Sequence, residues 1–155
     1  MVTHDDVAII GLSGLFPEAP TVADLHANLD AGRDSVRPLS LERMYFTSVD
    51  PSHDYTPLGW IDRVDLFDHS FFGISPREAA FMDPHQRIVL QLVCAAIEDA
   101  GYGLGALRGT DTGVFLSSPR PEYHELFTEV DPLELLGNAP SAIAGRVSYF
   151  LDLRG

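Results

Sequence analysis

A lone thiol is the first side chain that could act as a nucleophile. Cys94 is the single cysteine of the chain and lies in the apolar run 92–96 (LVCAA). A reactive thiolate needs an electropositive, partly exposed position, and no histidine or other base stands nearby in the sequence. Free cysteine usually behaves as a small buried hydrophobe, so we predict that Cys94 packs beside the apolar stripe of Val89, Val93 and Ile97. One cysteine also excludes an internal disulfide and a thiolate metal cage.

Two short groups combine acidic residues with histidine, the residue types of general acid–base catalysis. They are Asp83 with His85, and residues 122–125 (EYHE). Asp83 is better explained as a helix N-cap, and helix-end or surface roles are predicted for the others. The six histidines never recur at the i, i+4 spacing of a zinc-binding helix, and no Gly-x-Ser-x-Gly elbow is present. Neither zinc nor serine-hydrolase chemistry is indicated.

A glycine pair offers a third possibility, a nucleotide site. Residues 11–14 (GLSG) follow an apolar run, as the glycines of a dinucleotide-binding loop do. The third glycine is missing, and Pro17 interrupts the helix whose amides would bind a pyrophosphate. We predict a tight turn between a strand and a loop instead.

The chain is strongly acidic. Its formal net charge is −13, and all ten basic residues are arginine. Binding to a nucleic-acid backbone requires clustered positive charge, so no nucleic-acid partner is expected. No apolar run approaches the roughly 18 residues needed to cross a bilayer, and the polar start of the chain is unlike a signal peptide. We expect no membrane association and a cytoplasmic location.

In the N-terminal third, one strand and one helix are predicted. Residues 7–10 (VAII) form a short apolar run typical of a buried parallel strand. Thr21 can cap a helix that stops at Gly32. Residues 33–60 contain three prolines and are predicted to be irregular.

Two helix starts follow one another in the middle of the chain. Ser75 and Asp83 can act as N-caps, each is followed by proline, and Glu78 and Gln86 stand where they could complete capping boxes. The helix after the second cap is amphipathic and ends at Gly101.

The C-terminal third is predicted to hold a second strand and two helices. Residues 112–116 (TGVFL) read as a buried strand, a short helix starts near Pro121, and residues 138–150 form the last helix. Gly145 inside that helix suggests close helix packing. The fold class is therefore α/β, helix-rich with few strands, and two strands are too few for a complete sheet.

The order of several motifs is more specific than any one of them. They are 7–17 (VAIIGLSGLFP), 67–68 (FD), 71–79 (FFGISPREA), 82–87 (MDPHQR), 98–102 (EDAGY), 112–115 (TGVF), 137–138 (GN) and 144–149 (AGRVSY). Together they resemble the N-terminal part of the β-ketoacyl synthase (ketosynthase) domain of modular type I polyketide synthases. His85, where the family usually has glutamine, is a minor departure.

This resemblance implies the incomplete N-terminal half of a thiolase-like fold over residues 1–155. In the family, the motif at 144–149 leads shortly into the turn that carries the nucleophilic cysteine, and two histidines follow much later. None of these catalytic residues maps onto this chain. The family performs decarboxylative Claisen condensation of an acyl thioester with an extender unit, and the chain alone is expected to be inactive.

The resemblance also implies pocket-lining residues and partners. Two segments are expected to line the acyl tunnel, and their residues are Ser117, Ser118, Leu135, Leu136, Gly137 and Asn138. No bound cofactor is expected, although the family acts on phosphopantetheine-linked acyl groups of acyl carrier protein. Expected partners are acyl carrier protein, the rest of the ketosynthase domain and a second copy in a homodimer.

Two alternatives to an enzyme fragment remain open at this point. The chain could be a non-catalytic interaction module that pairs with a complementary ketosynthase chain or docks on the assembly line. It could also be an independent acyl-binding protein.

Overall fold

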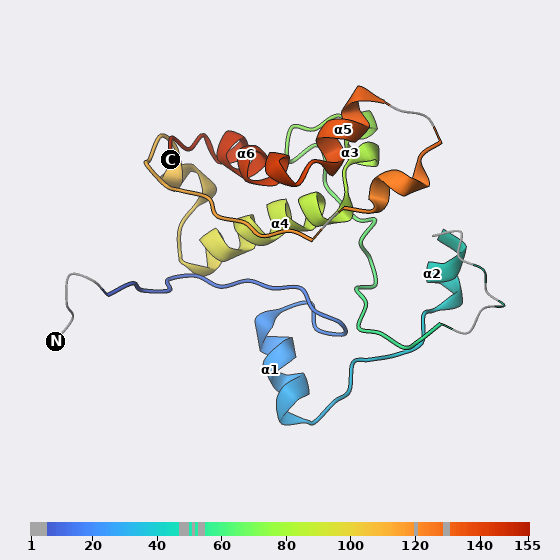
Figure 1. Ribbon diagram of the computed structural model, residues 1–155. Coiled ribbons are helices and arrows are strands. Elements are labelled where there is room, and N and C mark those ends of the chain that lie inside the picture. The colour runs from blue at the N-terminus through green and yellow to red at the C-terminus, as the bar shows by residue number, and fades with distance from the viewer. Residues whose placement is uncertain (1–5, 47–49, 51, 53–54, 120, 129–130) are drawn as a thin grey trace. The chain divides into compact units, whose positions relative to one another are not determined.

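The computed structural model describes residues 6–46, 50, 52, 55–119, 121–128 and 131–155. They fall into two compact units (Figure 1). The small unit is Ser13–Val64, and the large unit combines residues 6–12 with Asp65–Gly155.

The small unit contains α1 (Val22–Asp30) and α2 (Leu41–Phe46). The predicted cap is confirmed, since Thr21 Oγ1 accepts a hydrogen bond from the Asp24 amide at 3.1 Å. Gly32 follows α1 with a φ of 62°, as a helix stop requires. The prediction that residues 33–60 are irregular is wrong at α2. This short helix begins after Ser40, a residue type that favours helix N-termini. Ser40 Oγ accepts a hydrogen bond from the Arg43 amide at 3.1 Å.

Within the small unit, Arg37 joins the segment that follows α1 to residues 58–62. Its backbone exchanges hydrogen bonds of 3.2 and 3.1 Å with Leu58. Its guanidinium lies 3.6 Å from the centroid of the buried Trp60 ring and 2.8 Å from an Asp62 carboxylate oxygen. Trp60 Nε1 in turn donates to the Pro38 carbonyl at 3.3 Å. A cation–π contact and an ion pair therefore organise a segment that has little regular structure.

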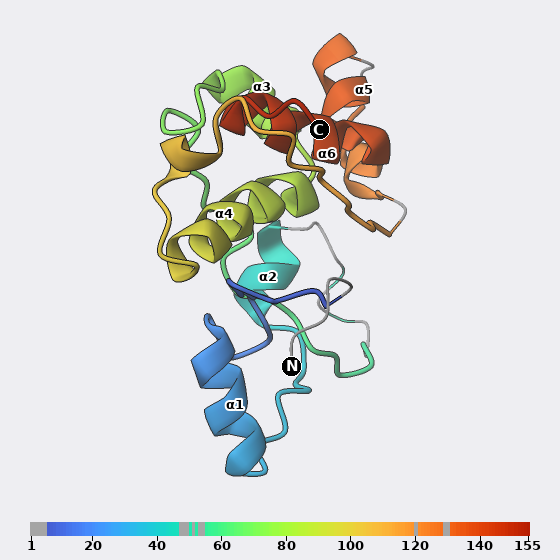
Figure 2. The same cartoon turned by 90° about the vertical axis from the view of Figure 1, so that its left-hand side faces the viewer.

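The large unit is built from helices. They are α3 (Pro76–Phe81), α4 (Pro84–Asp99), η1 (Leu104–Leu107), η2 (Tyr123–Leu126), α5 (Pro132–Asn138) and α6 (Pro140–Leu151). Within this unit α6 packs on α4, and α5 packs on α3 (Figures 1 and 2). The buried core cluster lies between these helices and consists of Met82, Leu90, Val147 and Leu151. The short helix predicted near Pro121 is confirmed as η2, a 3₁₀ helix.

Both predicted caps of the central helices are confirmed. Ser75 Oγ accepts from the Glu78 amide at 3.1 Å, and Asp83 Oδ1 accepts from the His85 amide at 2.7 Å. Gly101 follows α4 with a φ of 80°, which places the end of the helix where the sequence predicts it. Local capping chemistry therefore sets the bounds of α3 and α4.

The expectation that these two starts form full capping boxes is wrong, because tertiary partners take the side chains. The Glu78 carboxylate forms an ion pair with Arg146 of α6, with 2.6 Å between Oε1 and Nη1. Gln86 Nε2 donates to the carbonyls of Leu136 and Ala139, at 3.2 and 3.3 Å. Both side chains thus connect their helices to the C-terminal part of the chain.

The predicted last helix over residues 138–150 is confirmed as α6, which begins two residues later, at Pro140. Ala139 has φ −79° and ψ 117° and separates α5 from α6, because the residue before a proline, here Pro140, is disfavoured in helical geometry. The sequence reading missed α5, although Asp131 and Glu134 form a complete capping box at its start.

The two predicted buried strands are wrong in the described residues. Residues 7–10 and 112–116 form no ladder, and the only β-bridges described are the isolated pairs Phe16–Ala19 and Arg37–Leu58. Val7 and Phe115 are each 94% exposed. A strand is buried only when neighbours pair with its backbone and cover its faces, and no such neighbours occur in the described part of the chain. The helix-rich character of the fold is confirmed.

Close backbone packing joins α3 to α5. A Cβ built on Gly137 would lie 2.5 Å from the Phe81 carbonyl oxygen. Asn138 Nδ2 donates to the same carbonyl at 3.1 Å. Gly145, in contrast, has no atom within 4 Å of such a Cβ, so the close packing expected there is wrong for the described residues. Of these two glycines, only Gly137 is required by the packing of the large unit.

We predict that Gly137→Ala loosens the contact between α3 and α5, since its methyl group would force these backbones apart. The expected loss in local opening free energy is about 1–3 kcal/mol, measured by amide hydrogen exchange in α3 and α5. Gly145→Ala is the matched control and should slow exchange in α6, because alanine stabilises a helix interior by about 0.5–1 kcal/mol relative to glycine. Equal effects of the two substitutions would contradict the packing described.

We predict that the start of α5 loosens in acid. The backbone hydrogen bond from Leu133, and then Arg77, lower the pKa of Asp131. A carboxylate with a depressed pKa stabilises the fold fully above the ordinary aspartate range and loses that contribution as pH falls through the lowered value. The Leu133 amide resonance should therefore titrate below about pH 4. Asp131→Asn keeps a neutral cap and should abolish this titration; a titration that persists in the variant would exclude Asp131 as its source.

Candidate functional site

The residues predicted to line an acyl tunnel lie in two separate places of the large unit. Ser117 and Ser118 end the extended segment that follows Asp111, and Ser118 Oγ donates to the Pro119 carbonyl at 3.1 Å. Ser117 is exposed, and Ser118 is half-buried. Within the described residues, no hydrogen bond or ion pair joins these serines to α5.

The end of α5 carries the other four predicted residues, and they divide by burial. Leu135 and Leu136 are 65% and 56% exposed, whereas Gly137 and Asn138 are buried. Asn138 is fixed by the hydrogen bonds of its Nδ2 to the carbonyls of Phe81 and Glu134. Two leucine side chains are thus exposed on a helix end that is anchored to α3.

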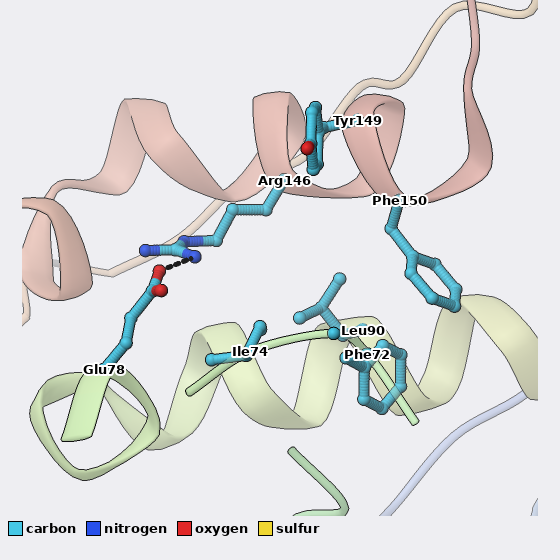
Figure 3. A pocket seen from close by; sticks show the side chains of 8 residues that line it. Phe72, Ile74, Glu78, Leu90, Arg146, Tyr149 and Phe150 are labelled. Carbon is cyan, nitrogen blue, oxygen red and sulfur yellow. Dashed lines mark hydrogen bonds and ion pairs between the residues drawn. The ribbon is translucent and has the colours of Figure 1, made fainter. Parts of the chain in front are cut away.

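A cavity of about 230 Å³ lies between α3, α4, α6 and the loop before α3 (Figure 3). It contains none of the predicted tunnel residues. Its lining residues are Phe72, Gly73, Ile74, Glu78, Leu90, Arg146, Tyr149 and Phe150.

The cavity has an apolar floor and one paired charge. The rings of Phe72 and Phe150 lie 4.8 Å apart, and Leu90 below them belongs to the core cluster. At the other end, Arg146 and Glu78 face each other in Figure 3 and form the 2.6 Å ion pair. Small-molecule sites usually measure about 300–1,000 Å³. This cavity is smaller, its two charged groups neutralise each other, and its lining supplies no free nucleophile or base.

Sequence reasoning missed this cavity, although a signal for it existed. Its lining comes mainly from the strings 71–79 and 144–149, which were selected from the sequence as family motifs. The structure brings those two strings together through Glu78 and Arg146, and Phe150, the residue after the second string, contacts Phe72.

The thiol of Cys94 is placed as predicted, buried in α4. Burial raises its pKa, and the neighbouring charge of Glu98 raises it further. Both effects disfavour the thiolate, which is the reactive form. Cys94 therefore has the environment of a structural side chain.

Asp83, His85 and Tyr123, from the two predicted acid and histidine groups, have structural partners. Asp83 Oδ1 lies 2.8 Å from His85 Nδ1 in addition to its capping bond. Tyr123 donates its hydroxyl to the Ala80 carbonyl at 3.1 Å. Within the described residues, no group of His, Cys, Asp or Glu is arranged to hold a metal ion. In that same part of the chain, every helix is too short or too polar to cross a bilayer.

Known polyketide synthases are similar to the chain over nearly its whole length. Polyketide synthase PksN of Bacillus subtilis is 37% identical over 163 residues, which is 97% of this chain and 3% of that protein. Polyketide synthase GfsA of Streptomyces halstedii is 40% identical over 99% of this chain and 2% of its own length. The chain thus spans a few per cent of the curated relatives that it matches.

Solved ketosynthases have the same local architecture. The ketosynthase from module 6 of the Bacillus subtilis bacillaene synthase matches 96% of this chain with a TM-score of 0.71 and 33% identity. Ketosynthase twelve of the bacillaene synthase in Bacillus amyloliquefaciens matches it with a TM-score of 0.75 and 34% identity. The chain covers 25% and 28% of these two structures. The family description "Beta-ketoacyl synthase, N-terminal domain" matches residues 4–155, and the chain therefore belongs to the β-ketoacyl synthase family.

Proposed function

We propose that this chain supplies the N-terminal part of a polyketide synthase ketosynthase domain. The complete domain would catalyse decarboxylative Claisen condensation of an acyl thioester with an extender unit on acyl carrier protein. The match of residues 4–155 to the N-terminal domain of the family carries this proposal. The acyl groups would arrive on phosphopantetheine arms, and the chain itself would hold no cofactor.

Unpartnered apolar side chains in the large unit support this assignment. Val7, Ile9 and Phe115 are 94%, 86% and 94% exposed. Tyr149 is 90% exposed on α6, one turn after Gly145, which has open space around it. Exposed apolar surface of this kind marks interaction sites. The surface fits a piece of a larger sheet domain, in which further strands and helices would cover it.

We assign the tunnel-lining role to the exposed residues of the two predicted segments. Leu135 and Leu136 are free to contact an acyl chain or a second subunit, while Gly137 and Asn138 hold α5 against α3. Ser117 and Ser118 would approach the same tunnel once the segment around them pairs into a sheet.

No side chain of this chain is proposed as the nucleophile. Condensation by the family requires a cysteine that captures the acyl group before carbon–carbon bond formation. The family motifs do not map that cysteine onto Cys94, and burial with Glu98 nearby raises the pKa of Cys94. The chain alone is therefore proposed to be inactive.

We predict that the purified chain is not acylated by a hexanoyl thioester of N-acetylcysteamine, because its only thiol is buried and protonated. Intact-mass measurement should show the unmodified mass, whereas ketosynthase twelve treated in parallel should gain one hexanoyl group. A hexanoyl adduct on this chain that disappears in Cys94→Ser would overturn the proposed inactivity.

A second function, an interaction module, is favoured by the same exposed segments. A chain that leaves apolar extended backbone uncovered is suited to pairing with another polypeptide, which would add strands to it. In this reading the chain pairs with a complementary ketosynthase chain or docks on the assembly line without catalysing a reaction.

We predict that the chain becomes stably folded only with a complement. Alone, it should lack a cooperative thermal transition, because whole domains are stable by only about 5–15 kcal/mol and much apolar surface is uncovered here. The complement is the part of ketosynthase twelve that this chain does not cover, affinity-tagged and co-expressed. A one-to-one complex with a cooperative transition is expected.

The N-terminal part of ketosynthase twelve, co-expressed with the same tagged complement, is the matched control for that experiment. If this control forms a complex and the present chain does not, the proposed complementation fails. A cooperative transition from a monodisperse monomer of the chain alone would refute the predicted dependence on a partner.

A further inference from the structure

Arg87, in the first turn of α4, is a buried cation. It keeps 8% of its accessible surface. Its Nε is fully buried and makes no hydrogen bond, whereas Nη1 and Nη2 keep some accessible surface through which a partner could reach them. Among the described residues, no carboxylate pairs with the Arg87 guanidinium and no acceptor takes a hydrogen bond from it. The one described interaction of the guanidinium is with the Tyr123 ring, whose centroid lies 5.7 Å from Cζ.

This environment leaves the charge of Arg87 under-compensated. A guanidinium stays protonated in proteins, so burial cannot be relieved by loss of the proton. A buried charge normally has an oppositely charged partner, because desolvation of an unpaired charge costs free energy. The Tyr123 ring lies near the outer limit of about 6 Å for cation–π attraction and offsets only part of that cost.

Four carboxylates of α3, α5 and the caps of α4 and α5 are already engaged, and none pairs with Arg87. Each one forms an ion pair or a capping hydrogen bond with another partner: Glu78 with Arg146, Asp83 with His85, Asp131 with Arg77, and Glu134 with the Asp131 amide. Glu122 and Glu125, on either side of Tyr123, make no described ion pair with Arg87 either, so no described carboxylate compensates this charge.

We propose that Arg87 binds a carboxylate of an aspartate or glutamate in the remaining part of the ketosynthase domain. This inference rests on the proposed function. The chain covers only 25% to 28% of the solved ketosynthases that it matches, so most of the groups that could surround α4 lie outside it. The planar guanidinium is matched by a carboxylate, which can accept two parallel hydrogen bonds.

The surroundings favour a single carboxylate over a phosphate or a larger ligand. Glu78, Asp83, Asp131 and Glu134 on the neighbouring elements, and a net charge of −13 for the chain, oppose the approach of a dianion. The small exposed fraction of Arg87 leaves room for one small group. A side-chain carboxylate meets both conditions.

A substitution at Gln91 can place a carboxylate of this chain beside Arg87. It lies one turn after Arg87 on α4, and its Nε2 donates to the Arg87 carbonyl at 3.2 Å. Acidic and basic side chains at i, i+4 lie within ion-pair reach on a helix. Gln91→Glu should therefore supply the missing carboxylate from within the chain and compete with an external one.

The first experiment titrates the chain with sodium acetate, following the Nε–H resonance of Arg87 in arginine-labelled protein. Arg87→Lys assigns the signal. Acetate is expected to shift the Arg87 Nε–H resonance saturably in the natural chain. The shift should be lost in Gln91→Glu. Sodium chloride at equal ionic strength should not produce it. Absence of a saturable shift, or an equal response to chloride, would overturn the carboxylate site.

The second experiment identifies the source of the carboxylate with the tagged ketosynthase twelve complement. Arg87→Gln should weaken its association with the chain by about 30-fold or more, as for a buried charge pair that loses one member. Arg154→Gln removes an exposed arginine of the same unit and should leave association unchanged.

The outcomes separate this inference from the proposed function. If the complex forms equally well with Arg87→Gln, the inference fails and the proposed function stands. If no variant associates with the complement, the proposed complementation fails, and the acetate titration still decides whether Arg87 binds a carboxylate.

Discussion

The large unit depends on one junction, where the turn between α5 and α6 packs on the turn between α3 and α4. The Asp83 amide donates to the Gly137 carbonyl at 2.9 Å, and Asn138 Nδ2 donates to the Phe81 carbonyl at 3.1 Å. Gln86 adds two hydrogen bonds from its side-chain amide to backbone carbonyls on the facing turn. Helix ends carry unsatisfied backbone groups, so these contacts satisfy both turns at once. Fixing the two turns together also fixes the direction of the four helices that leave them.

The same junction determines which side chains meet. With α6 directed along α4, Arg146 reaches Glu78, and Phe150 reaches Phe72. The cavity between them follows from this geometry. It lies where two segments far apart in the sequence are pressed together. The contacts that line the cavity also hold α6 against α4 and the loop before α3.

Sequence reasoning succeeded where local chemistry decides the structure. Thr21, Ser75 and Asp83 cap helices as predicted, because a capping hydrogen bond involves residues only two or three positions apart. It failed where distant partners decide. Glu78 and Gln86 were expected to complete capping boxes and instead bind α6 and the turn before it. No local pattern identifies such long-range acceptors.

The site was harder to predict than the fold, because it depends more on partners that are distant in the sequence. The burial of Cys94 follows from its apolar neighbours in the sequence, and it was predicted correctly. The cavity and the unpaired charge of Arg87 depend on contacts between elements that are far apart in the sequence. The two apolar runs at 7–10 and 112–116 show the limit most clearly. Their composition indicates strands, yet hydrogen-bonded neighbours and not composition alone make a strand, and the described chain does not provide them. A sheet is a property of several segments together, so a sequence can contain strand-forming segments without containing the sheet.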